Sequence, residues 1–155
     1  EATWQRRVPG IDRVTYLGVD IVEDVIRLNR EAMREWTRAS FEVWDVVTSR
    51  PPRAFDLVLC RDALFHLPLS DALRVLGNFD ASGSGLLVSH YDEALQHNWP
   101  DIEAGEWHSV NLLGPPFNLP PPLVSRPETG GPLEEGGVLY GPTRRLGLWR
   151  VPGLP

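Results

Sequence analysis

The sequence predicts a mixed α/β domain built on a mainly parallel β-sheet with flanking helices. Three features lead to this prediction: short apolar runs that end at acidic residues, an amphipathic helix between the first two runs, and a proline-rich stretch that excludes further helices near the C-terminal end. The chain has 155 residues, of which 42% are hydrophobic and 23% are charged. This length is sufficient for one hydrophobic core, so we expect a single domain over 1–155.

The composition argues against several partners. The 15 basic residues are all arginine and stand against 21 acidic residues, which gives a formal net charge of -6. Such a chain lacks an extended basic face, so we expect no nucleic-acid partner. No apolar run reaches the ~20 residues that cross a bilayer, and the first residues do not resemble a signal peptide. We therefore expect an intracellular, soluble, cytoplasmic protein with no membrane partner.

Cysteine usage bounds the means of stabilisation. The single cysteine, Cys60, excludes an internal disulfide, and no group of cysteines and histidines has the spacing of a structural zinc site. We therefore expect no metal, and a fold stabilised by packing.

The first elements alternate between strand and helix. Residues 14–19 are β-branched and aromatic and end abruptly at Asp20, as a buried strand would. Apolar residues then recur with a period of 3.6 over 22–36, which predicts a helix of about four turns. Asp20 and Glu23 have the spacing of a capping box at its start. Residues 41–44 predict the next strand, which again ends at an aspartate.

A second strand–helix–strand series follows. Residues 55–60 are nearly all apolar after the second position, which is typical of a strand covered on both faces. Ser70 is expected to cap a helix with its apolar side at positions such as Phe79, and residues 86–90 predict the next strand. This alternation indicates right-handed crossovers and parallel pairing.

The composition then changes. We expect residues 92–137 to form an irregular, proline-rich lid or loop, since 114–132 alone contain seven prolines. Two short runs close the chain at 138–140 and 146–151. They predict C-terminal antiparallel strands, paired with each other or with the edge of the sheet.

Acidic residues at the strand ends suggest a ligand. In an open parallel sheet, ligands bind beyond the carboxyl ends of the strands, and here these ends carry Asp20, Asp45 and Asp62. A carboxylate can accept hydrogen bonds from both ribose hydroxyls, and an acid after the next strand can meet an adenine amino group. The pattern therefore favours a ligand that contains adenosine.

Four segments in register, residues 16–20, 41–45, 55–67 and 86–90, also resemble a known family. They look like successive motifs of the class I methyltransferases that use S-adenosylmethionine. The resemblance implies a Rossmann-like fold, S-adenosyl-L-methionine as the cofactor, and transfer of its methyl group to an unidentified small-molecule or protein acceptor.

The resemblance also implies cofactor-binding residues. It makes Asp20 the ribose ligand, with Gly18 beside it, and gives the adenine contact to Asp45 or its neighbour. The full set implied for the cofactor is Gly18, Asp20, Asp45, Val46, Cys60 and Arg61. Of these, Cys60 and Arg61 stand with Asp62 as the wall beside the methyl-bearing sulfur.

Two residues are candidates for catalysis. Methyl transfer is an in-line displacement, so the protein orients the reactants and, where the acceptor carries a proton, supplies a base. His66 and Asp62 are the candidates for this base. They are four residues apart, and one turn of helix there would place both on the same face.

One motif of this family has no counterpart. Its members open with a strand and a glycine-rich turn that receives the methionine part of the cofactor. Here Gly10 stands alone, the chain begins at Glu1, and the only methionine is Met33. We therefore expect a fragment that is incomplete at its N-terminus and lacks the first strand and the glycine-rich motif.

Two other functions fit the same residues. A NAD-dependent oxidoreductase also uses an acid at the end of a strand to bind a ribose, and an upstream Gly-x-Gly-x-x-Gly turn would favour it. The missing glycine turn instead fits a non-catalytic, methyltransferase-like binding module. Both stay open as alternatives to the methyltransferase.

Overall fold

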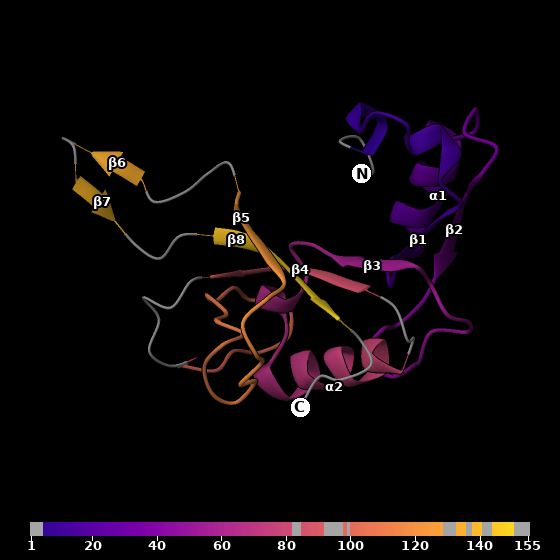
Figure 1. Ribbon diagram of the computed structural model, residues 1–155. Coiled ribbons are helices and arrows are strands. Elements are labelled where there is room, and N and C mark those ends of the chain that lie inside the picture. The colour runs from indigo at the N-terminus through magenta and orange to yellow at the C-terminus, as the bar shows by residue number, and fades with distance from the viewer. Residues whose placement is uncertain are drawn as a thin grey trace. The chain divides into compact units, whose positions relative to one another are not determined.

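The computed structural model in Figure 1 describes residues 5–81, 85–91, 98, 100–128, 133–135, 138–140 and 144–150. The chain forms two compact units, Glu1–Ser49 and Arg50–Pro155. Among the described helices, none is long and apolar enough to cross a membrane. The expectation of a single domain over 1–155 stays a prediction.

The first unit is a parallel strand–helix–strand motif. Two 3-10 turns, η1 (Gln5–Arg7) and η2 (Ile11–Arg13), precede strand β1 (Tyr16–Asp20). Helix α1 (Glu23–Ala32) connects it to strand β2 (Ala39–Val43), which pairs with β1 in parallel. The buried core of this unit contains Ile26, Met33 and Phe41, with Tyr16, Trp36 and Ala39 packed against it.

Helix α1 is shorter than the sequence predicts and begins differently. The backbone is still extended at Asp20, and the helix starts after Val22, which provides no side-chain cap. The predicted capping box is therefore wrong, although Asp20 Oδ1 accepts a hydrogen bond from the N–H of Val22 at 2.9 Å. At the other end, the Trp36 N–H donates to the Met33 carbonyl at 2.8 Å, so a turn rather than a helix carries Trp36 into the core.

The second unit contains a four-stranded mixed sheet in the order β3-β4-β8-β5. Strand β3 (Leu57–Cys60) pairs in parallel with β4 (Gly85–Tyr91), as predicted. Strand β8 (Arg144–Arg150) lies antiparallel between β4 and β5 (Val124–Pro127), and Figure 1 shows β4 between β3 and β8. The prediction of C-terminal antiparallel strands is confirmed.

Part of the region expected to be irregular is also extended. Strand β5 lies inside the proline-rich stretch, and β6 (Leu133–Glu135) pairs antiparallel with β7 (Val138–Tyr140). The irregular assignment is wrong for β5 and β6. Strand β5 tolerates its proline because it is an edge strand, where Pro127 removes no donor that an inner strand would need. Residues 92–97, 99, 129–132 and 136–137 lie outside the described part of the chain.

Helix α2 (Leu69–Asp80) packs its apolar side into the core of the second unit, with Ala72, Val75, Leu76 and Phe79 buried. The prediction that Ser70 caps this helix is wrong, because Ser70 lies inside its first turn. Pro68 occupies the N-cap position, and Asp101 Oδ1 accepts the N–H of Leu69 at 2.9 Å from 32 residues away. A loop far along the chain therefore supplies the acceptor that the sequence assigns to a neighbour.

Residues 100–128 pack closely although they contain little regular structure. Trp149 on β8 is 2% exposed and donates its indole N–H to the Pro120 carbonyl at 2.6 Å. The buried amide of Asn98 donates to the carbonyls of Asn111 and Pro115 and accepts the N–H of Asn111. These contacts fix the proline-rich stretch against the sheet of its own unit.

Candidate functional site

The parallel pair β1–β2 brings two predicted ligand residues to one edge of the first unit. Asp20 ends β1 and lies opposite Val43, the last residue of β2. Asp45 follows two residues later, and the Trp44 N–H donates to the Asp20 carbonyl at 2.9 Å. Because both strands run in the same direction, Asp20 and Asp45 lie beyond the same edge of the pair.

Asp20 keeps part of its carboxylate available. The side chain is half-buried, and Oδ1 accepts the hydrogen bond from Val22. Within the described part of the chain, no group donates to Oδ2. One oxygen therefore holds the turn into α1, while the other can accept a hydroxyl hydrogen from a ligand.

Asp45 is engaged in a turn of its own. Its Oδ2 accepts the Thr48 hydroxyl at 2.8 Å, and Oδ1 accepts the Val47 N–H at 2.9 Å. The bond from Thr48, followed by that from Val47, lowers the pKa of this carboxyl from its usual value. Each carboxylate oxygen of Asp45 thus already accepts a hydrogen bond, which leaves fewer lone pairs for a ligand. Val46, the next residue, is half-buried and could contact a ligand through its backbone.

Gly18 has a packing explanation. A Cβ at this position would lie 2.6 Å from Cδ1 and 2.7 Å from Cε1 of Phe41. Any larger residue would push against the ring that forms the core of the first unit. The structure accounts for this glycine without a ligand.

In the second unit, Cys60 ends β3 as a buried residue. Burial raises the pKa of its thiol to about 12, so the thiol stays protonated at neutral pH. A buried, protonated thiol is a poor nucleophile, and Cys60 serves here as a small apolar side chain.

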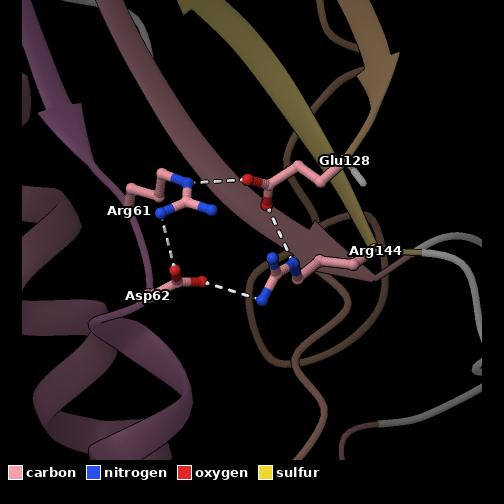
Figure 2. A network of polar contacts seen from close by, with 4 residues as sticks. All are labelled: Arg61, Asp62, Glu128 and Arg144. Carbon is pink, nitrogen blue, oxygen red and sulfur yellow. Dashed lines mark hydrogen bonds and ion pairs between the residues drawn. The ribbon is translucent and has the colours of Figure 1, made fainter. Parts of the chain in front are cut away.

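The next two residues enter a closed ring of ion pairs with Glu128 and Arg144, shown in Figure 2. Arg61 Nε donates to Glu128 Oε1 at 2.7 Å, and Arg61 Nη1 lies 3.0 Å from Asp62 Oδ2. Arg144 Nη1 donates to Asp62 Oδ1 at 3.2 Å, while its Nε forms an ion pair with Glu128 Oε2 at 3.1 Å. Two positive and two negative side chains thus alternate around the ring.

Burial differs around this ring. The Glu128 side chain is 5% exposed, whereas those of Arg61, Arg144 and Asp62 are 30%, 24% and 35% exposed. Asp62 also has a positive φ of 56°, in the left-handed region that aspartate tolerates better than most residues. The strand end at β3 is therefore a constrained turn with its charges already paired.

His66 lies at the end of the 3-10 turn η3 (Leu64–His66), with an exposed side chain. Its Nδ1 is 2.8 Å from the Glu106 carbonyl, which can only accept, so Nδ1 carries the hydrogen. In the neutral ring Nε2 then has the lone pair, which is the state a base requires. Three hydrogen bonds hold residues 105–108 next to η3. The Gly105 N–H donates to the His66 carbonyl, the His108 N–H donates to the Phe65 carbonyl, and His108 Nε2 donates to the Leu67 carbonyl.

The predicted helical turn that would put Asp62 and His66 on one face does not form. Asp62 is left-handed and η3 is only three residues long, so the spacing of four has no helical meaning here. The two side chains instead take separate partners: Asp62 contacts the two arginines of the ring, and His66 contacts the Glu106 carbonyl.

Sequence reasoning missed Glu128, Arg144 and Glu106. Each contacts a predicted site residue from 40 or more positions away, at separations of 67, 82 and 40 residues. The one available signal was weak, namely an acid after the last proline of β5 and an arginine pair that opens the closing apolar run. Among the described residues, no group of three or more His, Cys, Asp and Glu side chains could hold a metal ion.

No known family profile matches the chain. A curated relative, the phosphoethanolamine N-methyltransferase of Plasmodium falciparum (isolate 3D7), is 28% identical over 89 residues. The match covers 54% of this chain and 33% of the relative, so it spans only a third of that protein.

Solved structures match over a larger share of the chain. The N-methyltransferase NodS of Bradyrhizobium japonicum WM9 matches 88% of this chain and 72% of its own at a TM-score of 0.60 and 14% identity. NodS in complex with S-adenosyl-L-homocysteine matches at the same TM-score, 0.60, over 66% of that chain at 15% identity. TehB of Haemophilus influenzae matches at 0.58, over 87% of this chain and 49% of that protein, at 14% identity. The chain thus has a Rossmann-like α/β fold, which it shares with NodS and TehB.

Proposed function

We propose that this chain is part of a methyltransferase that uses S-adenosyl-L-methionine. The observation that carries the proposal is the edge of the β1–β2 pair, where Asp20 ends a parallel strand with one carboxylate oxygen available. The fold it shares with NodS, whose structure with S-adenosyl-L-homocysteine is among the matches, supports the same cofactor. S-adenosyl-L-methionine supplies an activated methyl group on its sulfonium.

Different residues are assigned to different parts of that cofactor. In the first unit, Asp20 Oδ2 accepts the ribose hydroxyls, and Asp45 or Val46 meets the adenine. Cys60 and Arg61 stay the residues proposed for the sulfur end. Gly18 acts in this scheme only by keeping β1 packed on Phe41, since that ring fills the space of its missing side chain.

His66 serves as the base of the proposed reaction. The Glu106 carbonyl holds Nδ1–H and leaves Nε2 with its lone pair exposed to an acceptor. The Asp62 carboxylate already pairs with Arg61 and Arg144, so we assign it the orientation of Arg61 and not proton transfer. An amine acceptor must lose one proton for each methyl gained, and Nε2 takes that proton.

Calorimetric titration with S-adenosyl-L-homocysteine tests the proposal. The variant Asp20→Asn keeps an oxygen for the Val22 N–H but replaces the second acceptor with an amide donor. Loss of a hydrogen bond to a charged group corresponds to a roughly tenfold to hundredfold weaker Kd. The control Asp24→Asn changes an exposed aspartate on α1 that pairs with Arg27, and its Kd should not change. Equal affinity of Asp20→Asn and the unmodified chain would refute the ribose assignment, and binding of NADH in place of S-adenosyl-L-homocysteine would favour the oxidoreductase alternative.

The first acceptor to test is phosphoethanolamine, because the name of the curated relative specifies it. Transfer of a labelled methyl group from S-adenosyl-L-methionine to this amine measures the activity directly. Cofactor binding without transfer to any amine would instead support the non-catalytic module.

A further inference from the structure

The turn after β3 is held in an unfavourable backbone conformation. Asp62 adopts a φ of 56°, which costs free energy for any residue other than glycine. Such a conformation persists only where its surroundings determine it. The surroundings here are the other three side chains of the ion-pair ring, since both carboxylate oxygens of Asp62 face a guanidinium.

The far side of the ring is built by the β5–β8 pair. The Glu128 N–H donates to the Arg144 carbonyl at 3.0 Å, one step beyond the pairing of Pro127 with Arg145. The backbone therefore sets the spacing of Glu128 and Arg144 before their side chains meet the turn. Figure 2 shows both side chains reaching from these strands toward Arg61 and Asp62.

Arg144 and Glu128 each contact two partners through two different atoms. Arg144 contacts Asp62 with Nη1 and Glu128 with Nε, and Glu128 offers one oxygen to each arginine. A lysine at position 144 would retain the charge but has a single nitrogen, so it could not keep both contacts in the same geometry. The ring has no net charge, so an anion gains little from it.

We infer that Glu128 and Arg144 are positioning residues that hold the Arg61–Asp62 turn in the conformation that receives the sulfur end of the cofactor. This inference rests on the proposed function. Neither residue touches the cofactor in this scheme. They act through Arg61 and Asp62, and the ring fixes the direction in which the Arg61 guanidinium points.

The variant Arg144→Lys tests this inference, with Arg145→Lys as the matched control. Arg145 is the next residue on the same strand, and its Nε donates to Ser125 Oγ at 2.7 Å. The probes are S-adenosyl-L-homocysteine and adenosine, which lacks the sulfur and the amino acid part. A misplaced contact weakens the affinity for S-adenosyl-L-homocysteine roughly tenfold in Arg144→Lys and changes that for adenosine less than about twofold. Arg145→Lys should change neither.

Equal weakening of both probes, or no weakening of either, would overturn the positioning role. Glu128→Gln is the second variant, because it keeps the side-chain shape and an acceptor for Arg61 while it removes the charge. Its affinity for S-adenosyl-L-homocysteine should also fall more than its affinity for adenosine.

A readout without ligand separates this inference from the proposed function. Hydrogen exchange of the segment 60–64 should be faster in Arg144→Lys than in Arg145→Lys, because the turn loses one of its anchors. If the unmodified chain binds neither probe, the proposed function fails, and the cofactor role of the ring fails with it. Unchanged exchange in Arg144→Lys would show that the ring does not hold the turn at all.

Discussion

The two units hold their strand-end carboxylates in different ways. In the first unit, Asp20 and Asp45 bond to groups two or three residues along the chain, namely Val22, Val47 and Thr48. In the second unit, Asp62 depends on Arg144, 82 residues away, as well as on its neighbour Arg61. The first arrangement forms as soon as the local turn forms, whereas the second requires the whole sheet.

The two kinds of contact also differ in how much they contribute to stability. Exposed short-range bonds contribute little to stability because water competes for the same groups. The ring contains Glu128 with 5% of its side chain exposed, so removal of one partner leaves a poorly solvated charge. A substitution in the ring should therefore destabilise the chain more than the loss of a short-range bond to Asp20 or Asp45.

The largest expected effect concerns His66, which depends on a contact from 40 residues away. His66→Asn keeps a donor for the Glu106 carbonyl but has no basic nitrogen. If the chain catalyses the proposed reaction, we expect methyl transfer to its acceptor to slow roughly 100-fold to 10,000-fold, the usual contribution of a base. Calorimetry should give an unchanged Kd for S-adenosyl-L-homocysteine. Equal losses in turnover and binding would show that His66 holds the cofactor instead.

The next effect concerns the packing of the second unit. Trp149→Ala removes a side chain that is 2% exposed and leaves the Pro120 carbonyl without its donor. The expected loss in the free energy of unfolding is about 3–5 kcal/mol, measured by urea denaturation followed by circular dichroism. Trp107→Ala is the control, since that side chain is 56% exposed, and it should cost less than about 1 kcal/mol. Similar losses in the two variants would contradict the proposed packing of 100–128 onto β8.

A smaller effect tests the first unit. Gly18→Ala places a methyl group 2.6 Å from a carbon of Phe41, so we expect a loss of about 1–3 kcal/mol in the free energy of unfolding. Phe41→Leu in the same chain should recover part of that loss, which a double-mutant cycle measures. Gly77→Ala in α2 has nothing within 4 Å of the new methyl and should stabilise the chain by about 0.5–1 kcal/mol. An additive cycle would mean that Phe41 is not what excludes a side chain at position 18.

The elements whose signals are local follow the sequence closely. The hydrophobic period of α1, the β-branched run of β1 and the apolar run of β3 each predict the element within a few residues of its observed bounds. The parallel pairing of β1 with β2 also follows from their alternation with a helix. These features depend on side chains close together along the chain.

The features set by remote contacts could not be predicted. Nothing near Leu69 indicates that Asp101 accepts its N–H, and nothing near Asp62 indicates a left-handed backbone held by Arg144. Strand β8 could equally have paired with β7 on its pattern alone, yet it enters the sheet between β4 and β5. The sequence therefore predicted which residues end the strands, but not what holds them.

The smallest expected effect is the pH dependence of stability that Asp101 and Asp45 cause. The pKa of Asp101 is lowered first by the Leu69 N–H, and that of Asp45 first by the Thr48 hydroxyl. Because each pKa is lower in the folded chain, each carboxylate stabilises the fold above its ordinary pKa. This contribution is lost as the pH falls through the folded value. Asp101→Asn should thus be slightly less stable than the unmodified chain at neutral pH and nearly equal to it at about pH 2.

NMR titration of the carboxyl resonances checks the same point directly. Thr48→Ala should return the pKa of Asp45 toward its usual value and leave that of Asp101 unchanged, because Asp101 takes its hydrogen bonds from Leu69 and Ile102. A stability difference between Asp101→Asn and the unmodified chain that persists in acid would show that charge is not its source.

The place of β8 in the sheet has a consequence for synthesis. The first unit can close once Ser49 has left the ribosome, since every strand and helix it needs lies before that residue. The sheet of the second unit waits for Arg144–Arg150, which fill the gap between β4 and β5. Until those residues emerge, two strand edges stay open to pairing with other nascent chains. The step most exposed to aggregation is thus the interval before Arg144–Arg150 leave the ribosome.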